Sequence, residues 1–197
     1  GVDIVLAMDV SSSMLAEDLE PNRLEAAKVV AAEFVAGRRN DRMGLVVFAG
    51  EAFTQAPLTL DQSVITDLLT QMEVGMIEDG TTVGMGLATA VKRLQVSEAE
   101  SKVVVLLTDG RSNTGEIGPV TAAQMAQALD MKVYTIGVGS RGTARVPVDD
   151  PIVGRRYISM QVDVDEPTLQ EVAETTGGRY FRATDRESLA QIYSEID

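Results

Sequence analysis

Two short, uninterrupted apolar runs constrain the fold of this chain more than any other feature. Residues 4–8 (Ile-Val-Leu-Ala-Met) are followed directly by Asp9, and residues 103–107 (Val-Val-Val-Leu-Leu) by Thr108 and Asp109. A strand that is apolar at every position is buried on both faces, which is typical of a parallel sheet covered by helices on each side. The two runs therefore predict central strands of an α/β protein, each ending in a polar loop.

Strand-like and helix-like patterns alternate along all 197 residues, which predicts a single domain over residues 1–197. We expect a doubly wound, mostly parallel six-stranded sheet with helices on both faces, strand order about 3-2-1-4-5-6, and a short antiparallel third strand. The segment at about 140–166 is longer than a strand-to-helix connection needs and predicts a hairpin-like insertion. Strands are expected at about residues 3–9, 43–48, 52–58, 102–108, 132–138 and 179–181, and helices at about 22–37, 62–72, 82–94, 120–129, 167–175 and from 185.

Three polar segments are expected at one edge of this sheet. Residues 9–13 (Asp-Val-Ser-Ser-Ser) follow the first strand, residues 108–110 (Thr-Asp-Gly) follow the fourth, and residues 79–82 (Asp-Gly-Thr-Thr) open a helix. In the expected order the first and fourth strands are neighbours, and ligands of such sheets bind where the topology reverses. Carboxylate and hydroxyl oxygens suit a small hard cation such as Mg²⁺. The three segments together predict one composite metal site.

The first loop also has a simpler interpretation. Ser and Asp are the usual residues at helix starts and turns, where their oxygens accept from free backbone N–H groups. Taken alone, the pattern of residues 9–13 indicates a turn as well as it indicates a site. The same placement of Asp109 at the end of a second strand favours the metal site.

Composition excludes several kinds of chemistry. The chain has no cysteine and no histidine, which excludes disulfides, thiol catalysis, the Ser-His-Asp triad and most transition-metal sites. Its net charge of −13 argues against nucleic acid and anionic membrane surfaces as partners. The apolar runs are of strand length, too short to span a bilayer. Because the chain begins at Gly1 without a leader, we interpret it as an excised fragment whose flanks could carry targeting or membrane anchors.

The three polar segments resemble a known motif. D-V-S-S-S, G-T-T-V-G and L-L-T-D-G, in this order, resemble the metal-ion-dependent adhesion site (MIDAS) of von Willebrand factor A (VWA) domains, and the resemblance covers nearly the whole chain. It implies a Rossmann-like fold and a bound Mg²⁺, or alternatively Mn²⁺ or Ca²⁺, that accepts an Asp or Glu from a partner protein. Thr82 is a rival to Thr81, although its place at the helix start suits a capping role. The ligands that the resemblance implies are Asp9, Ser11, Ser13, Thr81 and Asp109.

Further segments resemble the BatA proteins of bacterial aerotolerance (Bat) operons. This resemblance implies a membrane-tethered domain exposed outside the cytoplasm, on the periplasmic side, with membrane contact only through flanking segments. It also implies other Bat proteins or a MoxR-type AAA+ ATPase system as partners. The segments that carry the resemblance are residues 14–19, 21–28, 44–55, 84–90 and 134–139.

Two classes of function compete for these loops. One is a non-enzymatic binding module whose cation accepts a partner carboxylate. The other is a Mg²⁺-dependent phosphotransferase or phosphatase of the haloacid-dehalogenase type, which also places an Asp after its first strand. That chemistry needs a second carboxylate two residues further on, where this chain has Ser11, and a lysine near the phosphate, which all three loops lack. We therefore expect a binding module and no enzyme.

The insertion and the acidic residues after it each allow two interpretations. Residues 140–166 form either a surface decoration or a lip beside the metal crevice that a particular partner contacts. Asp163, Asp165 and Glu166 indicate a solvated approach to a helix rather than a second metal site, because the spacing of a calcium-binding loop is missing.

Overall fold

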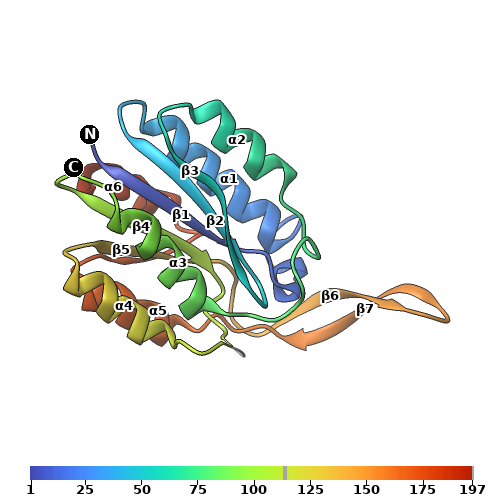
Figure 1. The fold of residues 1–197 in the computed structure, drawn as a ribbon. Coiled ribbons are helices and arrows are strands. Elements are labelled where there is room, and N and C mark those ends of the chain that lie inside the picture. Colours follow the sequence, from blue (N-terminus) through green and yellow to red (C-terminus); the bar gives the residue numbers. More distant parts are fainter. Residues whose placement is uncertain (113–114, 197) are drawn as a thin grey trace.

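A six-stranded sheet forms the centre of the computed structural model, which describes residues 1–112 and 115–196 (Figure 1). The spatial order is β3-β2-β1-β4-β5-β8, with β3 antiparallel to β2 and the other neighbours parallel. The strands are β3 (Ala52–Thr59), β2 (Arg42–Phe48), β1 (Asp3–Asp9), β4 (Lys102–Thr108), β5 (Lys132–Gly137) and β8 (Tyr180–Arg182).

Helices cover both faces of this sheet (Figure 1). α1 and α2 pack against each other on one face, and α3, α4 and α5 follow one another on the other face. The helices are α1 (Arg23–Gly37), α2 (Gln62–Gln71), α3 (Val83–Gln95), α4 (Pro119–Ala128), α5 (Glu166–Thr175) and α6 (Arg186–Glu195), and a short 3-10 helix, η1 (Ser12–Leu15), follows β1.

The apolar run of β1 is explained by this double cover. Ile4, Leu6 and Met8 belong to the core under α1 and α2, whereas Val5 and Ala7 belong to the core under α3, α4 and α5. Since successive side chains of a strand point to opposite faces, every position of β1 is buried, and every position between Asp3 and Asp9 is apolar. The same reasoning holds for β4, which lies beside β1 in parallel register.

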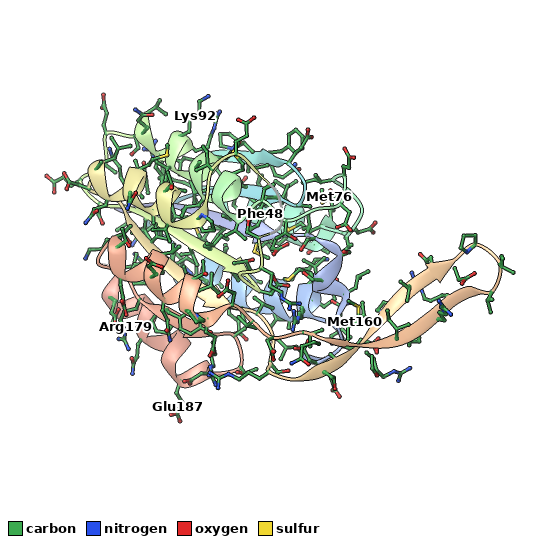
Figure 2. The ribbon with its side chains drawn as sticks, turned by 90° about the horizontal axis from the view of Figure 1, so that it is seen from below. Phe48, Met76, Lys92, Met160, Arg179 and Glu187 are labelled. Carbon is green, nitrogen blue, oxygen red and sulfur yellow. The ribbon has the colours of Figure 1, made fainter. Side chains whose placement is uncertain are left out.

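A two-stranded antiparallel hairpin projects from the body of the molecule (Figure 1). It consists of β6 (Thr143–Asp150) and β7 (Gly154–Gln161), and we call residues 143–161 the arm. Its attached end packs through Ala144, together with the adjoining Val162, on Ala16, just after η1. Figure 2 shows the free end extending away from the body, with Met160 near the attached end. An isolated pair of strands is only marginally stable, so the packing at the attached end anchors the arm.

The expected fold class is confirmed, including the strand order and the antiparallel third strand. The sixth strand in the sheet is the eighth in the chain, because β6 and β7 intervene and pair with each other. Most expected elements agree with the structure within two residues at either end. The 3-10 helix η1 was not expected. In the described parts of the chain, no helix combines the length and apolar character needed to cross a membrane.

Candidate metal centre

The two aspartates of the expected site lie at the carboxyl ends of β1 and β4, and neither has exposed surface. Asp9 Oδ1 accepts hydrogen bonds from the backbone N–H of Ser11 at 2.8 Å and from its hydroxyl at 2.5 Å. Asp9 Oδ2 accepts from Thr108 Oγ1 at 2.7 Å, across the β1–β4 pair. The carboxylate is therefore fixed by hydroxyl and backbone donors.

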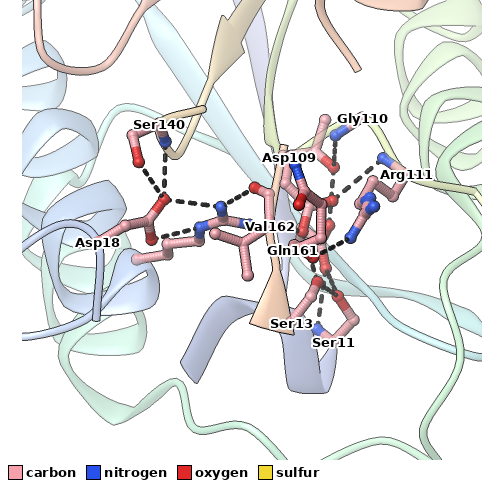
Figure 3. A network of polar contacts seen from close by, with 12 residues as sticks. Ser11, Ser13, Asp18, Asp109, Gly110, Arg111, Ser140, Gln161 and Val162 are labelled. Atoms are coloured by element: carbon pink, nitrogen blue, oxygen red, sulfur yellow. Dashed lines mark hydrogen bonds and ion pairs between the residues drawn. The ribbon is translucent and has the colours of Figure 1, made fainter. Parts of the chain in front are cut away.

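Ser13 connects this group to the second aspartate. Its hydroxyl donates to Asp109 Oδ2 at 2.5 Å and lies 3.1 Å from the hydroxyl of Ser11 (Figure 3). The 3-10 turn of η1, in which Met14 N–H donates to Ser11 O, places the two serines side by side. Asp9, Ser11, Ser13 and Asp109 thus form one continuous hydrogen-bonded row, although the two aspartates are a hundred residues apart.

The electrostatics of Asp9 indicate a place for positive charge. Burial raises the pKa of the Asp9 carboxyl to about 7, and the negative charge of Asp109 contributes in the same direction. Hydrogen bonds from Ser11 and Thr108 offset only part of this. A cation between the two carboxylates would stabilise their charged forms, because an opposite charge within a few ångströms favours ionisation.

The geometry separates the two threonines that the sequence left open. Thr82 Oγ1 donates to Ala49 O at 2.8 Å, and its N–H donates to the same oxygen at 2.9 Å, so Thr82 fixes the start of α3. Thr81 instead lines a pocket of about 610 Å³ together with Ser12 and Ser13. Thr81 is therefore the better placed of the two to face the row of oxygens.

Two neighbouring residues of the pocket were missed by the sequence reasoning. Asp79 accepts from the N–H of Ser12 at 3.1 Å and from its hydroxyl at 2.8 Å, which attaches the turn before α3 to the first loop. Arg111 lines the pocket beside Asp109 and donates through Nη1 to Gln161 O at 3.3 Å. Asp79 lies in the turn that suggested Thr81, but nothing in its local pattern indicates a partner 67 positions away.

A buried arginine next to the site was also missed. Arg23 has no exposed side-chain surface, and its Nη1 donates to Asp109 Oδ2 at 3.2 Å. In the sequence it is simply the first residue of a helix after the capping Asn22. No local signal distinguishes it from the surface arginines of other helices.

The expectation of a solvated acidic approach to α5 is wrong for Glu166. This residue is 8% exposed and accepts from Arg182 at 2.5 Å, from Arg141 at 2.5 Å and from Tyr180 OH at 2.8 Å. The hydrogen bonds from Arg182, the largest lowering cause, bring the pKa of Glu166 down to about 2 against the effect of burial. Its partners come from β8 and from the segment before β6, both distant in sequence, which a local charge pattern cannot reveal.

The side chains of Asp163 and Asp165 accept hydrogen bonds from backbone N–H groups. Asp165 Oδ1 accepts from Thr168 N–H at 3.3 Å and caps α5, and Asp163 Oδ1 accepts from Gly142 N–H at 2.6 Å at the attached end of the arm. Both also line the pocket near Thr81. Within residues 1–112 and 115–196, no three acidic side chains gather as they do in a highly charged metal site.

The donor set of the row suits a hard divalent cation. All candidate donors are oxygens, two from carboxylates and the others from hydroxyls, which matches the ligand preference of Mg²⁺ and Mn²⁺. With few negative charges and an open pocket, a cation held here would accept further ligands from outside the chain. The residues present therefore fit the group that the sequence implies.

Comparison with known proteins identifies the fold family. The family profile of the von Willebrand factor type A domain matches residues 3–195. The solved structure of BatB from Bacteroides thetaiotaomicron, described as a conserved hypothetical protein, is 33% identical, with a TM-score of 0.88 over 100% of this chain and 97% of that chain. An aerotolerance-related membrane protein from Bacteroides fragilis, with multiple mutations to serines, is 32% identical, with a TM-score of 0.88 over 100% and 98%.

A curated relative from Borreliella burgdorferi, named only as an uncharacterized protein, is 34% identical over 188 residues. The match covers 94% of this chain and 54% of the relative, so the chain spans about half the length of that protein. The resemblance to Bat aerotolerance proteins is confirmed at the level of the group, through BatB rather than the expected BatA. The chain belongs to the von Willebrand factor type A domain family.

Proposed function

We propose that this chain is a divalent-cation-dependent protein-binding module. The observation that carries the proposal is the row of two buried carboxylates and two hydroxyls, whose Ser13 lines the same pocket as Thr81. A MIDAS-type site uses such a row for a cation rather than for a reaction. Its ligands in this chain would be Asp9, Ser11, Ser13, Thr81 and Asp109.

The bound cation, Mg²⁺ in the first instance, would supply a positive charge that accepts a carboxylate from a partner. The chain's own residues do the remaining work. Thr108 and Ser11 hold Asp9 in place, Ser13 holds Asp109, and η1 carries Ser13, which lines the pocket. A carboxylate of the partner would then form a charge-assisted contact in a partly dry crevice, where such contacts are stronger than exposed ion pairs.

The site supports binding better than phosphoryl transfer. A phosphotransferase of the haloacid-dehalogenase type would need Asp9 as an accessible nucleophile, yet this carboxylate is fully buried and tied to three donors. The residue two positions further on is Ser11, whose hydroxyl donates to Asp9 and cannot replace a general acid of carboxylate type. We infer that the module is not an enzyme.

The relatives suggest where the module works. One solved neighbour is described as an aerotolerance-related membrane protein. We propose that residues 1–197 form one domain, with the segment at about 140–166 as its insertion, and that flanking segments tether it to a bacterial membrane on the periplasmic side. Other Bat proteins or a MoxR-type AAA+ ATPase system are the proposed partners, and the arm beside the pocket is the proposed second contact.

Calorimetric titration with Mg²⁺ and Mn²⁺ tests the proposal at its base. The wild type should bind one ion, and Asp109→Asn should weaken binding at least about tenfold while the fold is retained. Asp67→Asn is the matched control, because it makes the same chemical change at an exposed position of α2. A wild type that binds neither ion, or equal binding by Asp109→Asn, would refute the metal site.

The partner role needs a second experiment. Capture from native membranes with the wild type, in Mg²⁺ and in chelator, should recover a protein only when Mg²⁺ is present, and Ser13→Ala should lose it. Recovery in chelator at the level seen with Mg²⁺ would show that the metal is incidental to partner binding.

A further inference from the structure

Arg23 is the largest of the fully buried side chains in the described part of the chain, and its guanidinium contacts three separate segments. Nε and Nη2 form a fork on the two oxygens of Asp18, each at 2.7 Å. Nη1 donates to Asp109 Oδ2 at 3.2 Å, and Nη2 also donates to Val162 O. A buried charge is tolerated only when it is paired and hydrogen-bonded, and this one is.

Two of these contacts lie at the two chain ends of the arm. Val162 follows the last residue of β7 directly. Asp18 Oδ2, which Arg23 holds, accepts from the N–H of Ser140 at 2.7 Å and from its hydroxyl at 2.9 Å, three residues before β6 begins. The entry and the exit of the arm are thus both attached to the guanidinium that contacts Asp109.

The backbone before the arm is shaped around the same group. Gly139 has φ +142°, and a Cβ placed on it would lie 2.6 to 2.8 Å from Nη2, Cζ and Nε of Arg23. A side chain at this position would therefore displace the guanidinium. The chain leaves β5 by a path that only glycine allows and that brings it against Arg23.

We propose that Arg23 is a positioning residue that couples the arm to cation binding at Asp109. This inference rests on the proposed metal site. Asp109 Oδ2 accepts from both Ser13 and Arg23, so an ion that draws on this oxygen competes with the guanidinium for it. Any shift of Arg23 toward Asp18 and Val162 is then transmitted to both ends of the arm. Because such coupling is reciprocal, engagement of the arm changes the affinity for the ion by the same factor.

Arginine is required for this role by its shape. Its planar fork binds both oxygens of Asp18 and still presents Nη1 to Asp109, whereas a lysine ammonium is a point charge. Arg23→Lys keeps the charge and loses the simultaneous contacts. Arg23→Gln loses both the charge and the contacts. The pair of variants therefore separates positioning from simple charge repulsion.

The test measures ion affinity and the response of the arm in the same proteins. Electron paramagnetic resonance measures the Mn²⁺ affinity. NMR measures amide exchange, with and without Mg²⁺, at the N–H groups of Ser140, Gly142 and Val162. These three N–H groups donate to Asp18 Oδ2, Asp163 Oδ1 and Gly142 O, respectively. In the wild type, Mg²⁺ should change their exchange rates. Arg23→Lys should lose that response and bind Mn²⁺ about tenfold more weakly, as is usual when a residue that orients a ligand is changed.

Arg38→Lys is the matched control. Arg38 is also nearly buried and paired with an aspartate, Asp41, but it lies at the other end of α1. This variant should leave both the Mn²⁺ affinity and the exchange response as in the wild type. Equal losses in Arg23→Lys and Arg38→Lys would show a general effect of loosening the fold and would overturn the inference.

The other outcomes are equally distinct. If Arg23→Lys binds Mn²⁺ as the wild type does and Arg23→Gln binds it more tightly, Arg23 only repels the ion and positions nothing. If the wild type binds Mn²⁺ but its arm amides do not respond to Mg²⁺, the coupling is refuted while the metal site stands. Failure of the wild type to bind any ion removes the proposed function and this inference together.

Asp18→Asn keeps the test decisive if Arg23→Lys does not fold. It retains Arg23 and removes the charge that holds the fork. The exchange response at Ser140 and Val162 should then diminish by at least half. An unchanged response in this variant would contradict the coupling.

Discussion

At the carboxyl edge of the sheet Asp9 and Asp109 have no exposed surface, whereas at the free end of the arm Ile152 and Val153 are 93% and 74% exposed. The edge is fixed from three sides by β1, β4 and η1, and each oxygen of its row has a partner within the body. The free end of the arm is held by the pairing of its own two strands and by exposed ion pairs such as Arg155–Asp149. Exposed pairs of this kind contribute about 0–1 kcal/mol.

This difference separates two tasks that a binding module has to perform. A cation needs ligands held within tenths of an ångström, which the interior of a sheet edge supplies. A partner surface needs reach and exposed contacts, which the arm would supply in the proposed function. If the comparison is correct, substitutions at the edge change ion affinity strongly, and substitutions at the free end of the arm leave ion affinity and stability unaltered.

The largest effect is expected when both aspartates of the edge are removed. Asp9→Ala combined with Asp109→Ala should lower Mn²⁺ affinity at least about 100-fold, because it removes both carboxylates of the row. The apo fold should persist, since the apolar cores on the two faces of the sheet do not involve the row. Calorimetry measures the first effect and circular dichroism the second. An unfolded variant would show that the edge is a structural element and would break the comparison.

The fold and the proximity of Asp9 and Asp109 could be predicted from the sequence, because both follow from the pattern of strands and helices. Continuous apolar runs mark β1 and β4, and helix caps such as Asn22 and Asp61 lie directly before the helices they start. Once the strand order is known, the ends of β1 and β4 must be neighbours. The location of Asp9 and Asp109 then follows from topology without any knowledge of side-chain contacts.

The buried ion pairs could not be predicted in the same way. Arg23 meets Asp109 across 86 positions, and Glu166 meets Tyr180 and Arg182 of β8 across the whole of α5 and the loop after it. A charged residue has the same local pattern whether it faces solvent or a distant partner. Only the packed structure distinguishes the two cases. It shows that Arg23 and Glu166 are buried, although charged residues are usually exposed.

A tenfold loss of Mn²⁺ affinity is expected when one of the two threonines is changed. This result would show which threonine belongs to the metal site. Thr81→Ala should weaken Mn²⁺ binding about tenfold, because its hydroxyl is the proposed ligand. Thr82→Ala should instead lower the free energy of unfolding by about 1 kcal/mol, because it removes the hydrogen bond to Ala49 O. Titration and urea unfolding of both variants distinguish the roles. Reversed results would make Thr82 the ligand and place the site deeper at the start of α3.

Glu166 lies between the two regions and should show a moderate, pH-dependent effect. Glu166→Gln should lower the free energy of unfolding by about 1 kcal/mol at pH 7, because it weakens the contacts to Arg182 and Arg141, whose side chains are largely exposed. The folded-state pKa of about 2 lies below the ordinary value of 4.5. The contribution is therefore complete above about pH 4.5 and is lost as the pH falls toward 2.

Urea unfolding of the wild type and of Glu166→Gln at pH 7 and pH 3 measures this difference, which should shrink at pH 3. Glu174→Gln, the same change at an exposed position of α5, is the control and should have no effect at either pH. A difference that stays constant between the two pH values would show that Glu166 acts through packing and not through its charge.

Substitutions at the free end of the arm should have the smallest effect on the stability of the body. Their effect should be confined to partner capture. Ile152→Ser combined with Val153→Ser should change the free energy of unfolding by less than about 0.5 kcal/mol, because neither side chain packs on the body. Mn²⁺ affinity should also be unchanged, since the Arg23 contacts at the attached end remain. Capture of a partner from native membranes should nevertheless fall, because exposed apolar groups at the end of a projecting hairpin are suited to contact another molecule. Capture equal to that of the wild type would reduce the arm to a surface decoration and leave the metal edge as the whole of the binding surface.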